Sequence, residues 1–331
     1  MCIRDSGGTS ATSSADQFVI SVNSIDTPVI TPASGLYTGS VTITMSTSTS
    51  GATVMYTTNG AGLTNYTTPF TASTTSTIAA YAAKGGMTDS STATSMFTIR
   101  AETPVITPVS GSYVGSVSVT IITSTSGATI MYTVNGAGLT VYSGTITASA
   151  TSTIAAYAVK GGLVDSATST STFTIEAETL SVSVRDQSDS ADYTTWALGT
   201  LTESAVRIMD GTSCVLVKNS GNVAVDFSLS VSGTNWSFGS AVGIDVCTVM
   251  ALFNGNTAPI AGAFSTANDL VTGTEVWSTV DSGSGKYEGL ESGVNVNPSV
   301  GKKLYVYLKT PKFATKSDQE TTTITVGCKK H

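Results

Sequence analysis

The sequence TPVITPASGLYTGSVTI at residues 27–43 recurs as TPVITPVSGSYVGSVSV at residues 103–119. The copies continue without insertion or deletion, so residues 27–102 align with residues 103–178, and 54 of the 76 aligned positions are identical. A unit of this length is a whole small domain, because the stacked units of solenoid proteins are shorter, roughly 20 to 45 residues. We therefore predict two tandem domains of one type.

Alternating hydrophobic residues predict the strands of each repeat. In VTITMS, Val41, Ile43 and Met45 alternate with threonine and serine, which is the two-residue period of a half-buried strand. Six or seven such short strands in 76 residues predict an immunoglobulin-like β-sandwich. The same alternation assigns further inward-facing residues at Val54, Ile78, Ala80, Ala82, Phe97 and Ile99, and in the second copy at Val117, Val119, Ile121, Ile154, Phe173 and Ile175.

Glycine, asparagine and proline mark where these strands should end. We interpret GLYTGS at residues 35–40 as a turn, and Asn59-Gly60 as a turn whose residues tolerate positive φ. The prolines of TPVITP suit an edge strand, because proline cannot donate a hydrogen bond to a neighbouring strand. A domain this small buries only about 60–65% of its chain surface, so we expect contacts between neighbouring repeats to add stability.

Residues 179–331 depart from the repeat and predict one larger β-sandwich. KKLYVYLKTP alternates Leu304, Val306 and Leu308 with tyrosines, and TTTITVGC at residues 321–328 is the expected last strand. We interpret residues 220–222 as a hairpin turn that precedes an alternating strand. The inward face of that strand is assigned to Val223, Val225, Phe227, Leu229 and Val231.

Three motifs in each repeat resemble the bacterial chitobiase/β-hexosaminidase C-terminal-type domain, an immunoglobulin- or fibronectin-like module. They are PASGLYTGSV at residues 32–41, GATVMYTTNG at residues 51–60 and TIAAYAAKGGMTDS at residues 77–90. The resemblance implies a spacer, a wall-associated unit or an accessory of a secreted enzyme. The family usually carries Asp in the Y-T-T-D-G turn, where this chain has Asn59 and Asn135, which weakens an expectation of cation or sugar binding by that loop. Residues 215–231 resemble another immunoglobulin-like domain of secreted bacterial proteins.

Composition excludes several classes of function. Only 11% of residues are charged and 40% are hydrophobic, which disfavours intrinsic disorder. A net charge of -7 with 15 lysines and arginines leaves no basic surface for phosphates, so we expect no nucleic-acid partner. No apolar run approaches the roughly 18 residues of a membrane helix, so we expect no membrane span.

The N-terminal segment, residues 1–26, is set aside from the fold. MCIRDS resembles a translated sequencing-adapter artefact, and residues 18–20 occupy the place that the last strand of a repeat has before the second TPVITP. We expect a truncated array whose export signal was lost, and an extracellular or cell-surface location. The domain boundaries are therefore 1–26, 27–102, 103–178 and 179–331.

Catalytic and metal-binding patterns are scarce. His331 is the only histidine, so a Ser-His-Asp or Cys-His arrangement has no usable base, and we expect no enzyme activity. Asp186, Asp189 and Asp192 are spaced by three residues and could supply oxygen ligands to calcium. They lack the D-x-[DN]-x-[DN]-G order, so we favour a surface loop and keep a calcium site as the alternative.

Aromatic side chains are the candidates for contacts with sugars. Tyr66 and Tyr142 follow the AGLT segments and are expected to be exposed, and Trp196, Trp236 and Trp277 lie in the last domain. Tryptophan in a β-sandwich more often packs in the core, because its large apolar ring favours burial. The sequence does not place these rings on one face.

Cysteines leave two alternatives open. Cys214, Cys247 and Cys328 are either small buried residues or one disulfide with a free thiol.

Three functions remain as hypotheses. The first is a non-catalytic extracellular or surface spacer or adhesion array whose partners are neighbouring domains. The second is a carbohydrate-binding accessory region of a larger secreted enzyme, with a cell-wall or other polysaccharide as partner. The third is a self-assembling subunit of a surface layer, sheath or filament, since few charges protect its strand edges.

Overall fold

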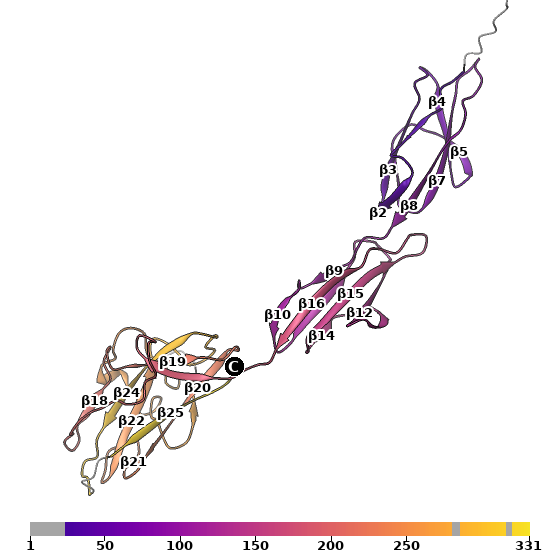
Figure 1. Cartoon of the computed structure of the whole chain (residues 1–331). Helices are drawn as coiled ribbons and strands as arrows, with labels where there is room; N and C mark the ends of the chain where they lie inside the picture. The colour runs from indigo at the N-terminus through magenta and orange to yellow at the C-terminus, as the bar shows by residue number, and fades with distance from the viewer. Residues whose placement is uncertain (1–23, 280–284, 316–319) are drawn as a thin grey trace, which may run out of the picture. The chain divides into compact units, whose positions relative to one another are not determined.

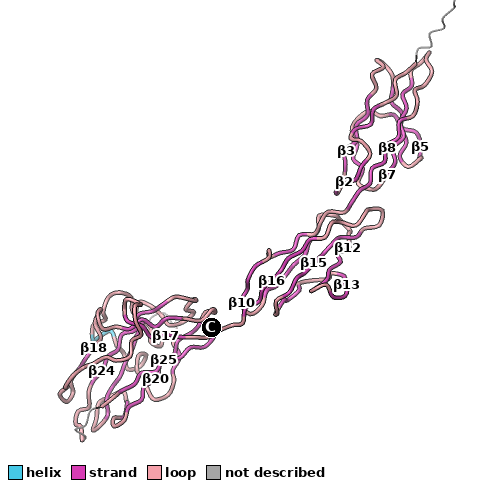
Figure 2. The backbone as a smooth tube through the Cα atoms, viewed as in Figure 1, coloured by secondary structure: helices cyan, strands magenta, loops and turns pink. Residues whose placement is uncertain are grey.

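The computed structural model describes residues 24–279, 285–315 and 320–331 (Figure 1). Strands and loops make up this part of the chain (Figure 2), apart from a three-residue 3-10 turn at Ala261–Ala263. In the same ranges no helix is long and apolar enough to cross a membrane. The described chain divides into two compact units, one formed by most of residues 24–173 and the other mainly by residues 174–331. The all-β prediction is confirmed.

The first repeat contains eight strands in two sheets, ordered β2–β8–β7–β4–β5 and β1–β3–β6. The strands are β1 (Val29–Thr31), β2 (Gly35–Thr38), β3 (Val41–Ser46), β4 (Thr53–Thr58), β5 (Ala61–Asn65), β6 (Phe70–Ala72), β7 (Ser76–Ala83) and β8 (Ala93–Arg100).

The second repeat reproduces this arrangement as β10–β16–β15–β12–β13 and β9–β11–β14. Its strands are β9 (Val105–Thr107), β10 (Gly111–Val114), β11 (Val117–Ile122), β12 (Thr129–Val134), β13 (Ala137–Val141), β14 (Ile146–Ala148), β15 (Ser152–Val159) and β16 (Ser169–Glu176).

The predicted inward faces form the cores of both repeats. In β3 every second residue is buried, and in β7 Ile78, Ala80 and Ala82 are fully buried. The exception to the predicted pattern is Ile175, which is half-buried although its counterpart Ile99 is fully buried. The edge position expected for TPVITP is also confirmed, since β1 lies at the end of its sheet.

The prediction of a turn at GLYTGS, residues 35–40, was wrong for its first four residues. Residues 35–38 form β2, which pairs with β8 in parallel, and the chain turns only at Gly39, whose φ is 73°. The AGLT segment also forms a strand, β5, so each repeat has eight strands and not six or seven. Both strands depend on pairing with residues distant in sequence, which local turn signals do not report.

The C-terminal region is a larger sandwich of two sheets. One sheet has the order β17–β19–β24–β22–β21 with β18 beside β24, and the other has the order β23–β20–β25. The strands are β17 (Val182–Asp186), β18 (Val206–Ile208), β19 (Val215–Asn219), β20 (Val225–Gly233), β21 (Ser237–Phe238), β22 (Val246–Phe253), β23 (Val276–Trp277), β24 (Gly301–Lys309) and β25 (Thr322–Lys330).

The hairpin predicted at residues 220–222 was wrong. β19 and β20 flank these residues but belong to different sheets, so the turn carries the chain from one layer to the other. Asn219 is fully buried there, and its amide group donates to the carbonyls of Val223 and Val296 at 2.7 and 2.8 Å. Cys214, Cys247 and Cys328 are all free thiols, which resolves the cysteine alternatives against a disulfide among them.

Candidate functional site

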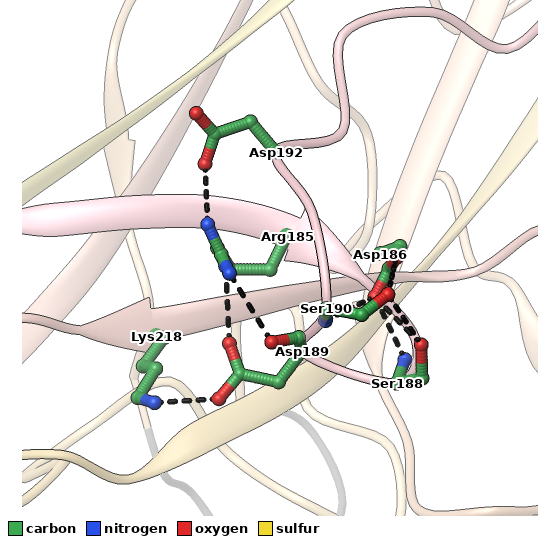
Figure 3. A network of polar contacts seen from close by, with 7 residues as sticks. All are labelled: Arg185, Asp186, Ser188, Asp189, Ser190, Asp192 and Lys218. Carbon is green, nitrogen blue, oxygen red and sulfur yellow. Dashed lines mark hydrogen bonds and ion pairs between the residues drawn. The ribbon is translucent and has the colours of Figure 1, made fainter.

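Of the three aspartates considered for calcium, Asp186 ends β17, and Asp189 and Asp192 follow it in the turn (Figure 3). Asp189 accepts from Arg185 at 3.1 Å and from Lys218 on β19 at 2.5 Å, and Asp192 accepts from Arg185 at 2.7 Å. Hydrogen bonds from Lys218 and Arg185 lower the pKa of Asp189. These two carboxylates are therefore held by cations of the protein itself.

Asp186 belongs to a separate set of contacts in the same turn. Its carboxylate accepts hydrogen bonds from the hydroxyls and backbone N–H groups of Ser188 and Ser190 (Figure 3). The bonds from Ser190, followed by those from Ser188, lower its pKa to about 2. An aspartate that accepts from the backbone two residues later closes a turn. Among the described residues, no group of three or more acidic, histidine or cysteine side chains could hold a metal ion, and we find no geometric support for the calcium alternative.

Tyr66 and Tyr142 pack inside their repeats. The ring of Tyr66 lies edge-on to Tyr56 with a centroid distance of 6.4 Å, and Tyr142 meets Tyr132 in the same way at 6.2 Å. Tyr66 is half-buried against the core of its repeat. Neither ring is a freely exposed flat platform.

Trp196 and Trp236 are also half-buried, and both pack against the C-terminal core. The backbone beside Trp236 is fixed by Glu320, whose carboxylate accepts N–H bonds from Thr234, Asn235 and Trp236. These bonds and the Thr234 hydroxyl outweigh partial burial and lower the pKa of Glu320. A cavity of about 60 Å³ adjoins Trp236, which is too small for a sugar ring when ligand pockets are about 300 Å³ or more.

Trp277 has a different environment. On β23 it lies opposite Ser228 of β20, on the outer face of the sheet, and the ammonium of Lys329 stands 4.7 Å from its ring centroid. Beside it, Ser228 donates to Glu275 at 2.5 Å. A side chain at Gly327 would lie 2.5 Å from the Ser228 hydroxyl, so this glycine leaves room for the carboxylate. Of the five aromatic candidates, Trp277 alone stands on an outer sheet face with charged neighbours.

His331 is exposed, and its ring lies beside a carboxylate that the sequence did not reveal. Its Nδ1 lies 2.7 Å from Oδ1 of Asp226 on β20. Asp226 also accepts the N–H of Asn295 at 3.0 Å.

A contact between the repeats was not predicted in detail, although contacts of this kind were expected. In the second repeat, the segment that follows β15, residues 161–164, forms backbone hydrogen bonds with the end of β8. Val164 donates its N–H to the carbonyl of Ile99 at 2.8 Å, and Ala101 donates to the carbonyl of Val164 at 2.9 Å. Leu163 packs against the core of the first repeat, and Ala101 is fully buried. We call the contact between residues 99–101 and residues 161–164 the joint.

The first repeat presents the same joint to the residues that precede it. Ser24 forms a parallel bridge with Thr88, as Arg100 does with Val164, and Ile25 is buried at the position of Ala101. The next residue is also held alike, since the N–H of Asp26 donates to Thr49 at 2.9 Å and that of Glu102 to Thr125 at 2.7 Å. The alignment of SID at residues 24–26 with RAE at residues 100–102 could have indicated this contact. The strand expected at residues 18–20 lies outside the described residues.

Comparison with protein families assigns the repeats. Residues 32–94 and residues 108–170 each match the family described as chitobiase/beta-hexosaminidase C-terminal domain. The two matches fall inside the two repeats, so the resemblance expected from the motifs is confirmed for them, and residues 171–331 lie outside it.

The remaining comparisons carry no functional argument. A cryo-EM reconstruction of E. coli alpha-2-macroglobulin in its native conformation is 6% identical, with a TM-score of 0.23, over 92% of this chain and 23% of that one. This chain thus spans less than a quarter of that protein's length. None of the curated proteins compared with the sequence matches it.

Proposed function

We propose that this protein is a non-catalytic spacer outside the cell or on its surface, in which immunoglobulin-like repeats set the distance between what lies before and after them. The observation that carries the proposal is the joint, because the same bridge, buried residue and threonine bonds recur at both repeats. A joint reproduced in each unit lets identical domains follow one another with identical contacts, which is the principle of repeat arrays.

The joint supplies mechanical coupling through backbone hydrogen bonds. Two N–H···O bonds at 2.8 and 2.9 Å flank Val164, and a third runs from the N–H of Thr75 to the carbonyl of Gly162 at 3.3 Å. Net contributions of about 0.5 to 1.5 kcal/mol for each bond, added to burial of Leu163 and Ala101, would favour the coupled state.

Substitution of Val164 tests this proposal. Val164→Pro removes the N–H that bonds to Ile99, whereas Val164→Ala keeps the backbone bonds and serves as the control. Residual dipolar couplings measured on the full chain should give one alignment tensor for both repeats in the wild type and Val164→Ala, and two in Val164→Pro. Two independent tensors in the wild type would refute a rigid spacer.

A second candidate function is side-by-side self-association, and the edge strands favour it. β5 and β13 end the larger sheets of the repeats, all their residues are exposed, and AGLTN and AGLTV carry no charge. Leu63 and Leu139 are each 51% exposed. Uncharged apolar edges are templates for pairing with another chain, and lysine on such an edge prevents it.

Sedimentation velocity at increasing concentration separates this candidate from a monomeric spacer. Self-association that disappears in Leu63→Lys/Leu139→Lys would support it. The control, Ile260→Lys/Leu290→Lys, adds the same charge at exposed positions of the C-terminal sandwich and should associate as the wild type does. A wild type that stays monomeric would eliminate the candidate.

A further inference from the structure

A groove of about 300 Å³ lies on the outer face of the larger C-terminal sheet, away from every residue that the sequence indicated as a site. Its floor is formed by two cross-strand pairs of β22 and β24, Thr248 with Lys309 and Met250 with Tyr307. Paired residues two apart on neighbouring strands share one face of a sheet, so these four side chains form a contiguous patch. The walls are Ser240, Ala241, Val242 and Thr266.

Neighbouring contacts hold the groove in shape. The ring of Phe264 lies 5.5 Å from that of Tyr307, at 43°, and fixes the phenol on the floor. The wall that carries Thr266 is tied down by Asp269, whose carboxylate accepts the N–H of Ser265 at 2.7 Å. The opposite wall is fixed by the N–H of Gly239, which donates to the carbonyl of Cys247 at 3.0 Å.

The polar groups of the groove have a definite charge pattern. Three hydroxyl side chains, a phenol and the ammonium of Lys309 line it, and no carboxylate does. Lys309 and Tyr307 are half-buried, and within the described ranges neither the ammonium nor the phenol hydroxyl has a hydrogen-bond or ion-pair partner from the protein. In a chain of net charge -7, this is a local positive site with unused donors.

We propose that this groove binds a single hexuronic acid unit, a sugar ring that carries a carboxylate. The carboxylate would pair with Lys309, and the ring hydroxyls would bond to Ser240, Thr248, Thr266 and Tyr307. The apolar face of the ring would rest on Met250 and the Tyr307 ring. A charge-assisted bond to carboxylate is about twice as strong as a neutral one, so it selects the acid. A volume near 300 Å³ is at the lower limit of ligand pockets and suits one ring.

Two simpler ligands fit less of the groove. Inorganic phosphate would engage Lys309 and leave the apolar floor uncovered. A neutral hexose would cover the floor and leave the ammonium unpaired in a half-buried position, where an unsatisfied charged group is unfavourable. This binding is independent of the spacer role, because it concerns only the C-terminal sandwich.

The test is titration of the full chain with galacturonate, glucuronate, glucose and phosphate at pH 7 and low salt, followed by NMR shifts. Saturable binding of at least one uronate is expected, at least about tenfold tighter than glucose or phosphate, with shifts at Thr248, Tyr307 and Lys309. Lys309→Met should weaken uronate binding about tenfold or more. Lys303→Met is the matched control, since Lys303 lies on the same face of β24 by alternation but outside the groove.

Several results would overturn the proposal. They are the absence of saturable uronate binding, equal binding of glucose or phosphate, shifts confined to other parts of the chain, and unchanged binding in Lys309→Met. A second variant, Tyr307→Phe, keeps the ring and removes one hydroxyl, so it tests the groove should Lys309→Met not fold. It should weaken uronate binding severalfold while its circular dichroism spectrum remains that of the wild type.

Discussion

The repeats and the C-terminal sandwich share a two-sheet architecture, but different polar interactions stabilise it. In the repeats, neutral side chains at equivalent positions accept the same backbone hydrogen bonds. Asn59 and Asn135 each accept an N–H at 2.8 Å, and Ser90 and Ser166 do the same. Among the described residues, every ion pair lies within residues 178–331. The duplicated set also has a charged member, since Lys84 and Lys160 each donate to a backbone carbonyl at 2.7 Å. Because these bonds are not ion pairs, the stability of the repeats should respond less to pH or salt than that of the C-terminal sandwich.

The cores differ as well. Ala80 and Ala82 fill the centre of the first repeat beside a few large residues, whereas the C-terminal core contains Phe227, Phe253 and Tyr287, all fully buried. The free energy of unfolding of a small domain is only a few kcal/mol. The comparison teaches that one core mutation should unfold a repeat and leave the C-terminal sandwich intact.

The largest effect is expected for Phe97→Ala in the first repeat. Truncation of a fully buried phenylalanine costs about 3 to 5 kcal/mol, close to the whole stability of a domain this small. Calorimetry of the full chain should show the transition of the first repeat lost or moved far down, with the C-terminal transition unchanged. A single transition that moves as a whole would contradict the separation of the two regions.

A smaller effect of opposite sign is expected for Asp269→Asn in the C-terminal sandwich. Asp269 is 3% exposed, its Oδ1 has no partner, and burial raises its pKa from 3.8 to about 6. The N–H of Ser265 and the nearby Lys286 oppose this shift. Because the folded state binds the proton more tightly, the wild type should lose about 2 to 3 kcal/mol as pH rises from about 4 to above 6.

Thermal melts from pH 4 to 8 measure this change. In Asp269→Asn the C-terminal sandwich should melt at a higher temperature than the wild type at pH 7. Its melting temperature should no longer fall as pH rises from 4 to above 6. Asp186 and Asp210, whose pKa values are lowered to about 2, have the opposite dependence, since their contribution is lost as pH falls below about 5. The decisive slope for Asp269 is therefore the one above pH 5. The transitions of the repeats provide the internal control. A wild-type C-terminal transition that does not move over this range would refute the assignment.

Local alternation sufficed to predict the cores of the repeats, because Ile43, Ile78 and Phe97 follow the period of a half-buried strand. It could not predict which segments pair. GLYT carries turn residues but forms β2 beside β8, and residues 220–222 resemble a hairpin turn but join two sheets. Pairing depends on partners distant in sequence, which local patterns do not contain.

The candidate sites were harder to predict for the same reason. The spacing of Asp186, Asp189 and Asp192 was visible, but not that Lys218 of another strand neutralises Asp189. Tyr307 was assigned only as a residue opposite a core face, and Lys309 was not assigned. The segment that includes Thr266 turns that face of the sheet into a groove. The candidate sites of this chain lie where the tertiary fold brings together segments that are distant in sequence.

A moderate effect is expected for Asn59→Ala in the first repeat, where neutral bonds should matter most. Asn59 has a φ of 52°, and its side chain accepts the N–H of Thr77 at 2.8 Å. Alanine loses this bond and strains the backbone, at a cost of about 1 to 3 kcal/mol. Asn59→Asp keeps an acceptor and should stay within about 0.5 kcal/mol of the wild type by calorimetry. Equal melting of all three proteins would show that the turn contributes nothing.

The smallest effect is expected for Lys218→Met, which removes one of the two cations at Asp189. The pair is partly exposed, and exposed ion pairs contribute little because solvent and salt screen them. The C-terminal melting temperature should fall slightly at low ionic strength and match that of the wild type in 1 M salt, where the Debye length is about 3 Å. Arg185 keeps its contact with Asp189, so the turn should persist. Among the described residues, the repeats take part in one ion pair, that of Glu178 at the end of the second repeat with Lys330. A salt dependence of the first repeat's own transition would therefore show that the division between a weakly charged and a charged region is wrong.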